Sequence, residues 1–375
     1  MPDVSQVRFA SAVNYNAATE LSPGAGAGLE PDYLRRYAQA LENGGFDLAL
    51  LGYSSDSPDP FTVAGALSQL TSTIRPTLAV RPNTVHPTWA ARALASLDQL
   101  SGGRITLHVI SGGSDADQAR EGDVLDKASR YARTDEWLEI LQRSWASDGP
   151  IDFDGDHYTI RDFRASVKPV DGRIPISFAG SSAEAYDIGA RRADIYALWA
   201  EPVEQTRQQV ETVRRLAAAA GRAEAPEIWL SLRPIIAPTE ELAWEKAYRV
   251  LGALEQQRPR LVGGRDAAAA SVQGPSVQNA GSQRLLEAAA RGERFDRALW
   301  TPLVTASGAS GASVAVVGTP DTVVQQILDF VDVGVSIFAM RGYDNLNDVI
   351  DYGRHLIPAV HAELASRGSS QVRAS

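Results

Sequence analysis

The sequence predicts an α/β fold, a (β/α)8 TIM barrel built as a single domain over residues 1–375. About eight apolar runs of strand length alternate with segments whose apolar residues recur at helical spacing. Residues 75–113 hold one complete strand–helix–strand unit, and the two strands of such a unit lie parallel. The rival fold is a doubly wound sheet. It is disfavoured because its glycine-rich dinucleotide turn is missing after the first strand.

The expected strands are short apolar runs that end in Gly, Pro or polar residues. In chain order they span 7–13, 47–52, 77–81, 105–110, 175–179, 195–199, 228–236 and 336–340. Another short apolar run lies at 314–318, and two aromatic-rich runs predict a small hairpin over 151–163. Sites in parallel α/β folds are built at the carboxyl ends of such strands.

The expected helices fill the connections between the strands. Gly44 and Gly102 stop the first and third of them, because Gly suits a helix end. The predicted helices span 31–43, 60–70, 88–99, 128–145, a segment from Ala183, 203–220, 240–254, 320–332 and 345–366. Residues 256–313 are rich in Gly, Ala and Ser and predict an insertion or mobile lid after strand seven. We expect 367–375 to fray.

Composition excludes several kinds of chemistry. The formal net charge of -10 argues against nucleic acid or an anionic membrane as the main partner. The absence of cysteine excludes disulfides, thiolate catalysis and cysteine-ligated metals. The first residues lack the pattern of a signal peptide and no apolar run is long enough to cross a bilayer, so we expect a soluble cytoplasmic protein.

Gly180-Ser181-Ser182 is a candidate phosphate site, because a strand ends there and a helix begins. Backbone N–H groups and the positive end of the helix suit an anion, and the serine hydroxyls add donors. An ordinary serine N-cap is the favoured interpretation of the local sequence alone. The position late in the barrel strengthens the phosphate interpretation.

The positions of the histidines and lysines disfavour two further kinds of chemistry. The five histidines lack metal-site spacing, so no metal is expected, and none of the lysines lies at a strand end, which disfavours a Schiff base. His108 lies within a strand and is either a core residue or a group that faces a ligand. Glu201 and Asp59 follow strands and could act as acid or base, although surface carboxylates are the default.

Three arginines lie in or just after apolar runs, where an unpaired charge is costly. We expect a structural salt bridge for Arg81, whereas an anionic ligand competes with that interpretation for Arg233 and Arg341. Aromatic residues at strand ends could line the pocket of a flat cofactor, although each alone is more often core: Tyr15, Tyr53, Trp199 and Tyr343. With metal, thiol and lysine chemistry disfavoured, an organic cofactor is the expected source of reactivity.

Several stretches resemble the bacterial-luciferase-like flavin monooxygenases, and most closely their alkanesulfonate monooxygenase branch. The most specific is AVRPNTVHPTWAARALASLDQLSGGR at 79–104. Similar stretches lie at 129–141 (SRYARTDEWLEIL), 178–202 (FAGSSAEAYDIGARRADIYALWAEP), 239–244 (TEELAW) and 317–327 (VGTPDTVVQQI), and the late Gly342-Tyr343 pair also matches. The resemblance covers nearly the whole chain.

The resemblance implies a barrel that binds reduced FMN from a separate NAD(P)H-dependent FMN reductase. Oxygen would form a flavin C4a-peroxy adduct that oxidises the substrate, commonly with carbon–sulfur cleavage. It also assigns residues by position. The flavin phosphate would contact Ser181 and Ser182 beside Gly180, with Ser111 and Tyr131 nearby. His108 and Trp199 would flank the ring, and Tyr343 would face the reaction centre, where it could assist proton transfer. Related barrels are usually homo-oligomers, so a dimer or tetramer is expected.

The chain departs from the alkanesulfonate pattern around the substrate. Ser57 stands where cysteine is typical, and Ser231-Leu232-Arg233 replaces an Arg-Leu-His motif. The lid segment 306–311 lacks the usual arginine, and Arg341 stands where a small residue is usual. Arg233 and Arg341 are therefore expected to rebuild an anion site, with Tyr15 and Ser57 beside it, for a sulfonate or another small anion. The alternatives are a deazaflavin-dependent dehydrogenase and a flavin-binding protein that lacks oxygenase activity.

Overall fold

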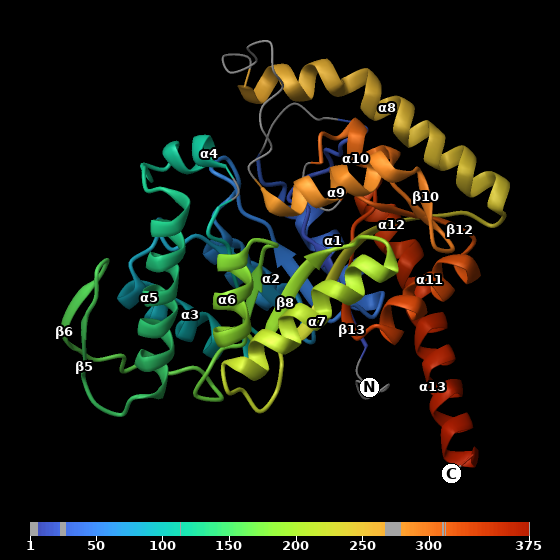
Figure 1. The fold of residues 1–375 in the computed structure, drawn as a ribbon. Coiled ribbons are helices and arrows are strands. Elements are labelled where there is room, and N and C mark those ends of the chain that lie inside the picture. The colour runs from blue at the N-terminus through green and yellow to red at the C-terminus, as the bar shows by residue number, and fades with distance from the viewer. Residues whose placement is uncertain are drawn as a thin grey trace.

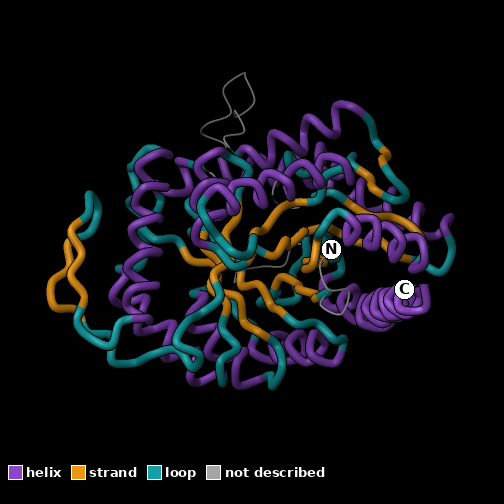
Figure 2. Tube along the Cα trace, turned by 60° about the horizontal axis from the view of Figure 1, so that its bottom comes forward, coloured by secondary structure: helices purple, strands orange, loops and turns teal. Residues whose placement is uncertain are grey.

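The computed structural model describes residues 7–22, 28–112, 114–266, 279–309, 311 and 313–374, and only the backbone course of 257–266 and 368–374. Eight parallel strands close into a ring in which β1 (Arg8–Ala12) pairs with both its sequence neighbour and the last strand. The others are β2 (Leu48–Leu51), β3 (Arg75–Val80), β4 (Thr106–Val109), β7 (Ile176–Ala179), β8 (Ile195–Trp199), β9 (Glu227–Ile236) and β13 (Val335–Met340). The predicted TIM barrel is confirmed (Figure 2).

The barrel is wrapped by helices whose bounds agree closely with the predicted ones. They are α1 (Pro31–Asn43), α2 (Pro60–Leu70), α3 (Pro87–Ser101), α5 (Lys127–Ala146), α6 (Ala183–Arg192), α7 (Val203–Ala219) and α11 (Pro320–Asp332). Proline stands at the start of α1, α2 and α3, where its missing N–H costs no hydrogen bond. Gly102 ends α3 with a φ of 69°, in the left-handed conformation that glycine adopts readily.

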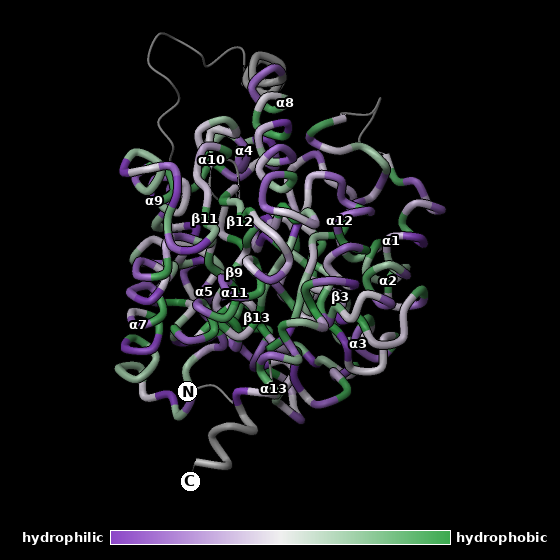
Figure 3. Tube along the Cα trace, turned by 90° about the vertical axis from the view of Figure 1, so that its right-hand side faces the viewer, coloured by the Kyte–Doolittle hydropathy of each residue, from purple (hydrophilic) through white to green (hydrophobic). Residues whose placement is uncertain are grey.

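Successive side chains of each barrel strand face alternately the barrel interior and the layer beneath the helices. Leu78 and Val80 of β3 point outward into the main core, so Thr77 and Ala79 face the interior. A separate apolar cluster fills the interior and includes Leu48, Trp229 and Ile337. Figure 3 shows the pattern: apolar strands lie at the centre, and more polar helices such as α7 lie outside.

The predicted strand at 314–318 forms, as β12 (Ala315–Gly318), but it lies outside the barrel. It pairs in parallel with the second half of β9, which is long enough to contribute both to the barrel and to this extension. Two short strands, β10 (Arg294–Phe295) and β11 (Leu299–Trp300), continue the same sheet edge in antiparallel pairing. The hairpin predicted at 151–163 is confirmed as β5 (Ile151–Asp154) and β6 (Thr159–Phe163).

The segment predicted as an insertion carries helices above the carboxyl ends of the strands (Figure 1). Helix α8 (Glu240–Asp266) runs longer than the predicted 240–254, and α9 (Ala280–Arg291) and α10 (Pro302–Ala306) follow. Residues 267–278 of the predicted lid lie outside the described part of the chain. The mobility of a lid over 256–313 stays a prediction.

The chain closes with α12 (Asn345–Asp351), a π-helical turn (Tyr352–Leu356) and α13 (Ile357–Ala374), which projects from the barrel (Figure 1). This continuous helical stretch runs past the predicted end at Ser366, and the predicted fraying of 367–375 stays a prediction. Within the described residues, no helix combines the length and the hydropathy needed to cross a membrane.

Candidate functional site

A cavity of about 270 Å³ opens at the carboxyl end of the barrel beside Gly180, Ser181 and Ser182. The N-termini of three helices border it: α5 with Lys127, α6 with Ser182 and α9 with Ala280. The first N–H groups of a helix have no partner inside the helix, and the helix dipole places partial positive charge there. Three such ends around one cavity favour an anion.

The glycine at this turn is required by its surroundings. Gly180 has a φ of 138°, and a Cβ built on it would lie 2.7 Å from the Cβ of Ala185 and 3.5 Å from Oη of Tyr131. Ser182 caps α6, because its Oγ accepts a hydrogen bond from the N–H of Ala185 at 3.4 Å. The N-cap interpretation and the anion-site interpretation are therefore compatible, since Ser182, which caps the helix, also lines the cavity.

Two basic side chains line this cavity, which we call the anion cradle (Gly112, Asp115, Lys127, Arg130, Tyr131, Gly180, Ser181, Ser182, Asn279 and Ala280), and each is paired with a carboxylate. Lys127 Nζ lies 3.2 Å from Glu184, and Arg130 donates to Asp115 at 2.7 Å. Burial raises the pKa of Tyr131, so its hydroxyl remains a proton donor at neutral pH. These donors fit a phosphate group.

The resemblance also assigns Ser111 and Trp199 to the cofactor, and these two residues have different surroundings. Ser111 is buried and its Oγ lies 3.1 Å from Oγ1 of Thr134 on α5, so this hydroxyl is already bonded to the helix layer. Trp199 ends β8 and is half-buried. A Cβ built on Gly281 of α9 would lie 3.0 Å from its ring. Helix α9 therefore covers Trp199 and also reaches the cradle.

His108 lies in the barrel interior with 8 % of its surface exposed. Its Nδ1 lies 2.9 Å from Oγ of Ser177 on the adjacent strand β7, and its ring centroid is 6.4 Å from that of Trp229. Burial lowers the pKa of His108 to about 4, because the interior disfavours the charged ring. The side chain is therefore neutral near pH 7.

Several small side chains face the barrel interior at and beyond the level of Trp229. By strand alternation, five strands direct alanine into the interior: Ala12, Ala79, Ala179, Ala197 and Ala339. Methyl groups occupy little volume, so this end of the barrel suits a flat ring better than the packed layer below it does.

Arg233 and Arg341 meet at one carboxylate, that of Glu20. Arg233 is buried and donates to Glu20 at 2.7 Å and to the carbonyl oxygen of Gly342 at 2.8 Å. The half-exposed Arg341 lies 3.1 Å from the other oxygen of Glu20. Burial alone would raise the pKa of Glu20, but the two arginines outweigh that effect and lower it. This group, which we call the arginine pair, keeps one positive charge in excess.

Glu20 is the residue that sequence reasoning missed. It lies in the loop between β1 and α1, and nothing in its local sequence connects it to Arg233, 213 positions away. The sequence is compatible with both a salt bridge and an anionic ligand for these arginines. The structure contains the salt bridge and leaves a net positive charge.

Tyr343 is buried against Arg233, whose Cζ lies 3.6 Å from the ring centroid. Its neighbours include Ile235 and Trp300 of a cluster on the outer side of β9. Burial raises the pKa of Tyr343 to about 12, and its hydroxyl has no hydrogen-bond partner in the described structure. Its role at a reaction centre stays a prediction.

Tyr15 and Ser57 were expected beside the substrate, and both make hydrogen bonds to nearby backbone. The Oη of Tyr15 donates to the carbonyl of Gly52 at 3.3 Å, and burial raises the pKa of Tyr15 to about 12. Ser57 Oγ donates to the carbonyl of Ser54 at 2.9 Å, inside the turn after β2. A substrate contact by either residue stays a prediction.

Arg81 has the structural role expected for it. It is buried at the end of β3 and is bonded to Glu121 at 2.7 Å and to Asp117. Its guanidinium also lies over the ring of Tyr53, at 5.1 Å from the centroid. With two carboxylates bonded to it, Arg81 holds the segment after β4 in place and has no charge in excess.

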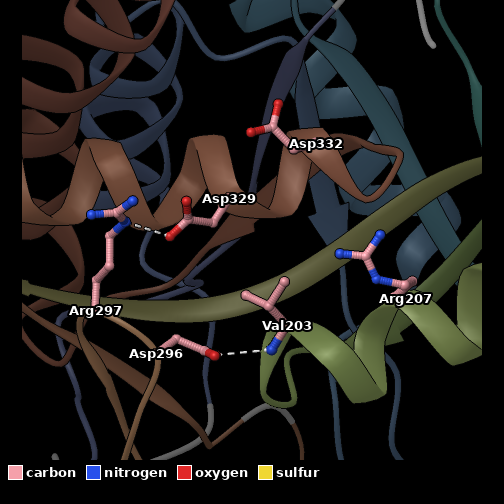
Figure 4. Close-up of a pocket in the computed structure, with 6 residues that line it drawn as sticks. All are labelled: Val203, Arg207, Asp296, Arg297, Asp329 and Asp332. Atoms are coloured by element: carbon pink, nitrogen blue, oxygen red, sulfur yellow. Dashed lines mark hydrogen bonds and ion pairs between the residues drawn. The ribbon is translucent and has the colours of Figure 1, made fainter.

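A second cavity, of about 370 Å³, lies on the flank of the barrel between α7 and α11 (Figure 4). Arg297 pairs with Asp329 at 2.6 Å, and Asp296 accepts a hydrogen bond from the N–H of Val203 at 2.8 Å. Its charged groups thus satisfy one another or the backbone. We therefore place the functional site at the anion cradle, where donors of three helices converge.

The model of the luciferase-like monooxygenase family matches residues 11–336. Among solved structures, riboflavin lyase with modified FMN and riboflavin is 22 % identical with a TM-score of 0.80, covering 97 % of this chain and 92 % of that one. EDTA monooxygenase from Chelativorans sp. BNC1 is 19 % identical with a TM-score of 0.76, covering 97 % and 94 %.

Two more solved structures have the same fold. DmoA from Hyphomicrobium sulfonivorans is 21 % identical with a TM-score of 0.77, covering 97 % of this chain and 89 % of that one. A coenzyme F420-dependent secondary alcohol dehydrogenase is 18 % identical with a TM-score of 0.68, covering 95 % and 99 %. At these identities the structures show a shared fold.

Proposed function

Because the chain belongs to the luciferase-like monooxygenase family, we propose that it is a two-component monooxygenase that uses reduced FMN and O2 to oxidise a small organic anion. The observation that carries the cofactor proposal is the anion cradle. Its serine hydroxyls, helix N-termini and cations suit the phosphate of FMN, which riboflavin lacks. When bound, reduced FMN supplies the electrons with which one atom of O2 is inserted into the substrate.

The protein's own residues would bind and orient the reactants. Ser181 and Ser182 would hold the phosphate at one side of the barrel mouth, and Trp199, covered by α9, would pack against the ring. His108 would offer a neutral nitrogen to the ring or the substrate, since burial keeps its pKa near 4. The helices above the mouth would exclude water from the reaction.

The substrate would be held by the arginine pair. Arg233 and Arg341 lie on β9 and just after β13, whereas the cradle lies beside β4 and β7 on another side of the ring. With Glu20 included, the pair keeps one positive charge, which suits a substrate with a single negative charge. A sulfonate or another sulfur-containing anion of the kind used by the alkanesulfonate branch is the class we favour.

The remaining parts of the proposal rest on the family resemblance and on the sequence. Reduced FMN would come from a separate NAD(P)H-dependent FMN reductase. The protein would act in the cytoplasm as a homo-oligomer, a dimer or tetramer. The acidic net charge of -10 disfavours nucleic acid and an anionic membrane as partners.

The cofactor proposal is tested by rapid mixing of the protein and photoreduced FMN with oxygenated buffer, followed by absorbance. We expect an absorbing transient that lives longer than any formed by reduced FMN alone, because the protein shields the ring from water. Oxidation at the rate of the protein-free control would overturn the oxygenase proposal.

The anion proposal is tested by Arg341→Ala in steady-state turnover with small sulfonates. Loss of one charge in a partly exposed site should raise KM about tenfold and leave the Kd of FMN unchanged. Arg367→Ala is the control, because Arg367 makes a comparable 3.1 Å ion pair with Asp332 away from the barrel mouth. Parallel loss of substrate and FMN binding in Arg341→Ala would contradict a separate anion site.

A coenzyme F420-dependent dehydrogenase is the second candidate function. Two structures whose names carry that cofactor share the fold with TM-scores of 0.68 and 0.67, below the 0.76 of EDTA monooxygenase. Titration with the deazaflavin separates the candidates. Oxygen-independent reduction of the deazaflavin by an alcohol would favour the dehydrogenase, and binding of FMN with a substrate-dependent use of O2 would favour the monooxygenase. Tight flavin binding with neither activity would favour a binding protein.

A further inference from the structure

Ser177 and His108 form a hydrogen-bonded polar pair inside the barrel. They are register partners on the adjacent parallel strands β7 and β4, so both side chains project to the same face. Ser177 is fully buried, and its Oγ lies 2.9 Å from Nδ1 of His108. Apolar residues of the interior cluster, Ala179 and Trp229, lie around them.

The direction of the proton in this hydrogen bond follows from what each group can satisfy. A serine hydroxyl has one proton to donate, and in the described structure the hydroxyl of Ser177 has a single partner, Nδ1 of His108. If Nδ1 carried the proton, the hydroxyl hydrogen would be buried without an acceptor. Leaving a buried donor unpaired costs about 1–3 kcal/mol. The hydroxyl therefore donates to Nδ1.

A neutral imidazole whose Nδ1 accepts must carry its proton on Nε2. Burial keeps the ring neutral, because the pKa of His108 lies at about 4. Within the described residues Nε2 has no hydrogen-bond partner, and the ring is not fully closed off, with 8 % of the residue exposed. The ring thus has one satisfied nitrogen and one nitrogen available to a ligand.

We propose that Ser177 is a positioning residue that holds His108 in the Nε2–H tautomer, so that the barrel presents a neutral hydrogen-bond donor to the cofactor or substrate. The inference rests on the proposed function and deepens it, since it makes His108 a donor and excludes it as a general base. A neutral donor stabilises negative charge that develops on a bound group without itself losing a proton.

The test is nuclear magnetic resonance of the ligand-free protein labelled with ¹⁵N in histidine. Long-range ¹H–¹⁵N correlations distinguish the protonated nitrogen from the unprotonated one, and His108→Asn identifies the signals of His108. We expect Nε2 protonated and Nδ1 hydrogen-bonded in the wild type. In Ser177→Ala, the Nδ1 resonance should move to the position of a nitrogen without a hydrogen bond, and Ser177→Thr should restore it. A wild-type Nδ1 that carries the proton, or a resonance that Ser177→Ala leaves in place, would overturn the proposal.

A kinetic measurement on the holoenzyme separates positioning from a merely structural role. Ser177→Ala should lower kcat about tenfold with KM and the Kd of FMN near their wild-type values, because binding groups elsewhere are intact. Equal losses in FMN binding and kcat would indicate a structural role and contradict the proposal. The resonance experiment uses no cofactor, so the tautomer can be established even if the monooxygenase proposal fails.

Discussion

At the residue scale, His108 shows how position changes the chemistry of a side chain. A histidine in water is partly charged near neutral pH. His108 instead lies inside the barrel, on strand β4, which pairs with β3 and β7. Burial favours the neutral ring and lowers its pKa to about 4. The same burial gives the folded protein a dependence on pH that can be measured.

Acid should destabilise the fold through His108. Between its folded pKa of about 4 and the unfolded value of 6.5, the unfolded chain binds a proton that the folded protein does not. Stability is therefore lost as the pH falls through this range, by about 2 kcal/mol between pH 7 and pH 5. Urea unfolding of the wild type and of His108→Asn at both pH values measures this loss. We expect the variant to lose less stability by about this amount. Equal losses in the two proteins would mean that His108 has the same pKa in the folded and the unfolded state and would contradict this prediction.

At the element scale, the N-terminus of α6 depends on the turn that precedes it. Gly180 permits a φ of 138° and leaves no room for a Cβ, since Ala185 would lie 2.7 Å away. The close approach of the turn to the helix places Ser181 and Ser182, just before α6, on the wall of the anion cradle. A side chain at this position would displace both the turn and the donors.

Gly180→Ala should weaken FMN binding at least tenfold, about 1.4 kcal/mol, because the first turn of α6 must shift. The measurement is a titration followed by flavin fluorescence. Gly221→Ala is the matched control, since Gly221 also has a positive φ, 76°, but has no atom within 4 Å of a built Cβ and lies at the far end of α7. It should cost stability through backbone strain and leave the Kd of FMN unchanged. Equal weakening in both variants would contradict a local role for Gly180.

At the scale of the whole molecule, closure of the barrel places two positive sites around one mouth in a protein of net charge -10. The anion cradle lies beside β4 and β7, and the arginine pair beside β1, β9 and β13. The acidic surface and the positive mouth together favour small anions over polyanions, because a polyanion also meets the repulsive surface around the mouth. This distribution agrees with two separate anionic ligands, a phosphate-bearing cofactor and a substrate.

The fold and the cradle could be predicted because their signals are local. Apolar periodicity marked the strands and helices, and Gly180-Ser181-Ser182 marked the turn where a strand passes into a helix. The buried salt bridge of Arg81 was also expected, since an apolar strand cannot hold an unpaired charge. The boundary of α8 and the place of β12 outside the barrel were not predicted, because both depend on which neighbours are available for packing and pairing.

By itself the sequence determined a barrel of parallel strands wrapped by helices, a turn suited to phosphate, and the absence of thiol chemistry. Only the tertiary structure decided that Glu20 binds Arg233 and Arg341, that Ser177 binds His108, and that α9 covers Trp199. The reason is physical. Alternation along one strand fixes the face on which a side chain lies, but the register between strands and the closure of the barrel select its partner.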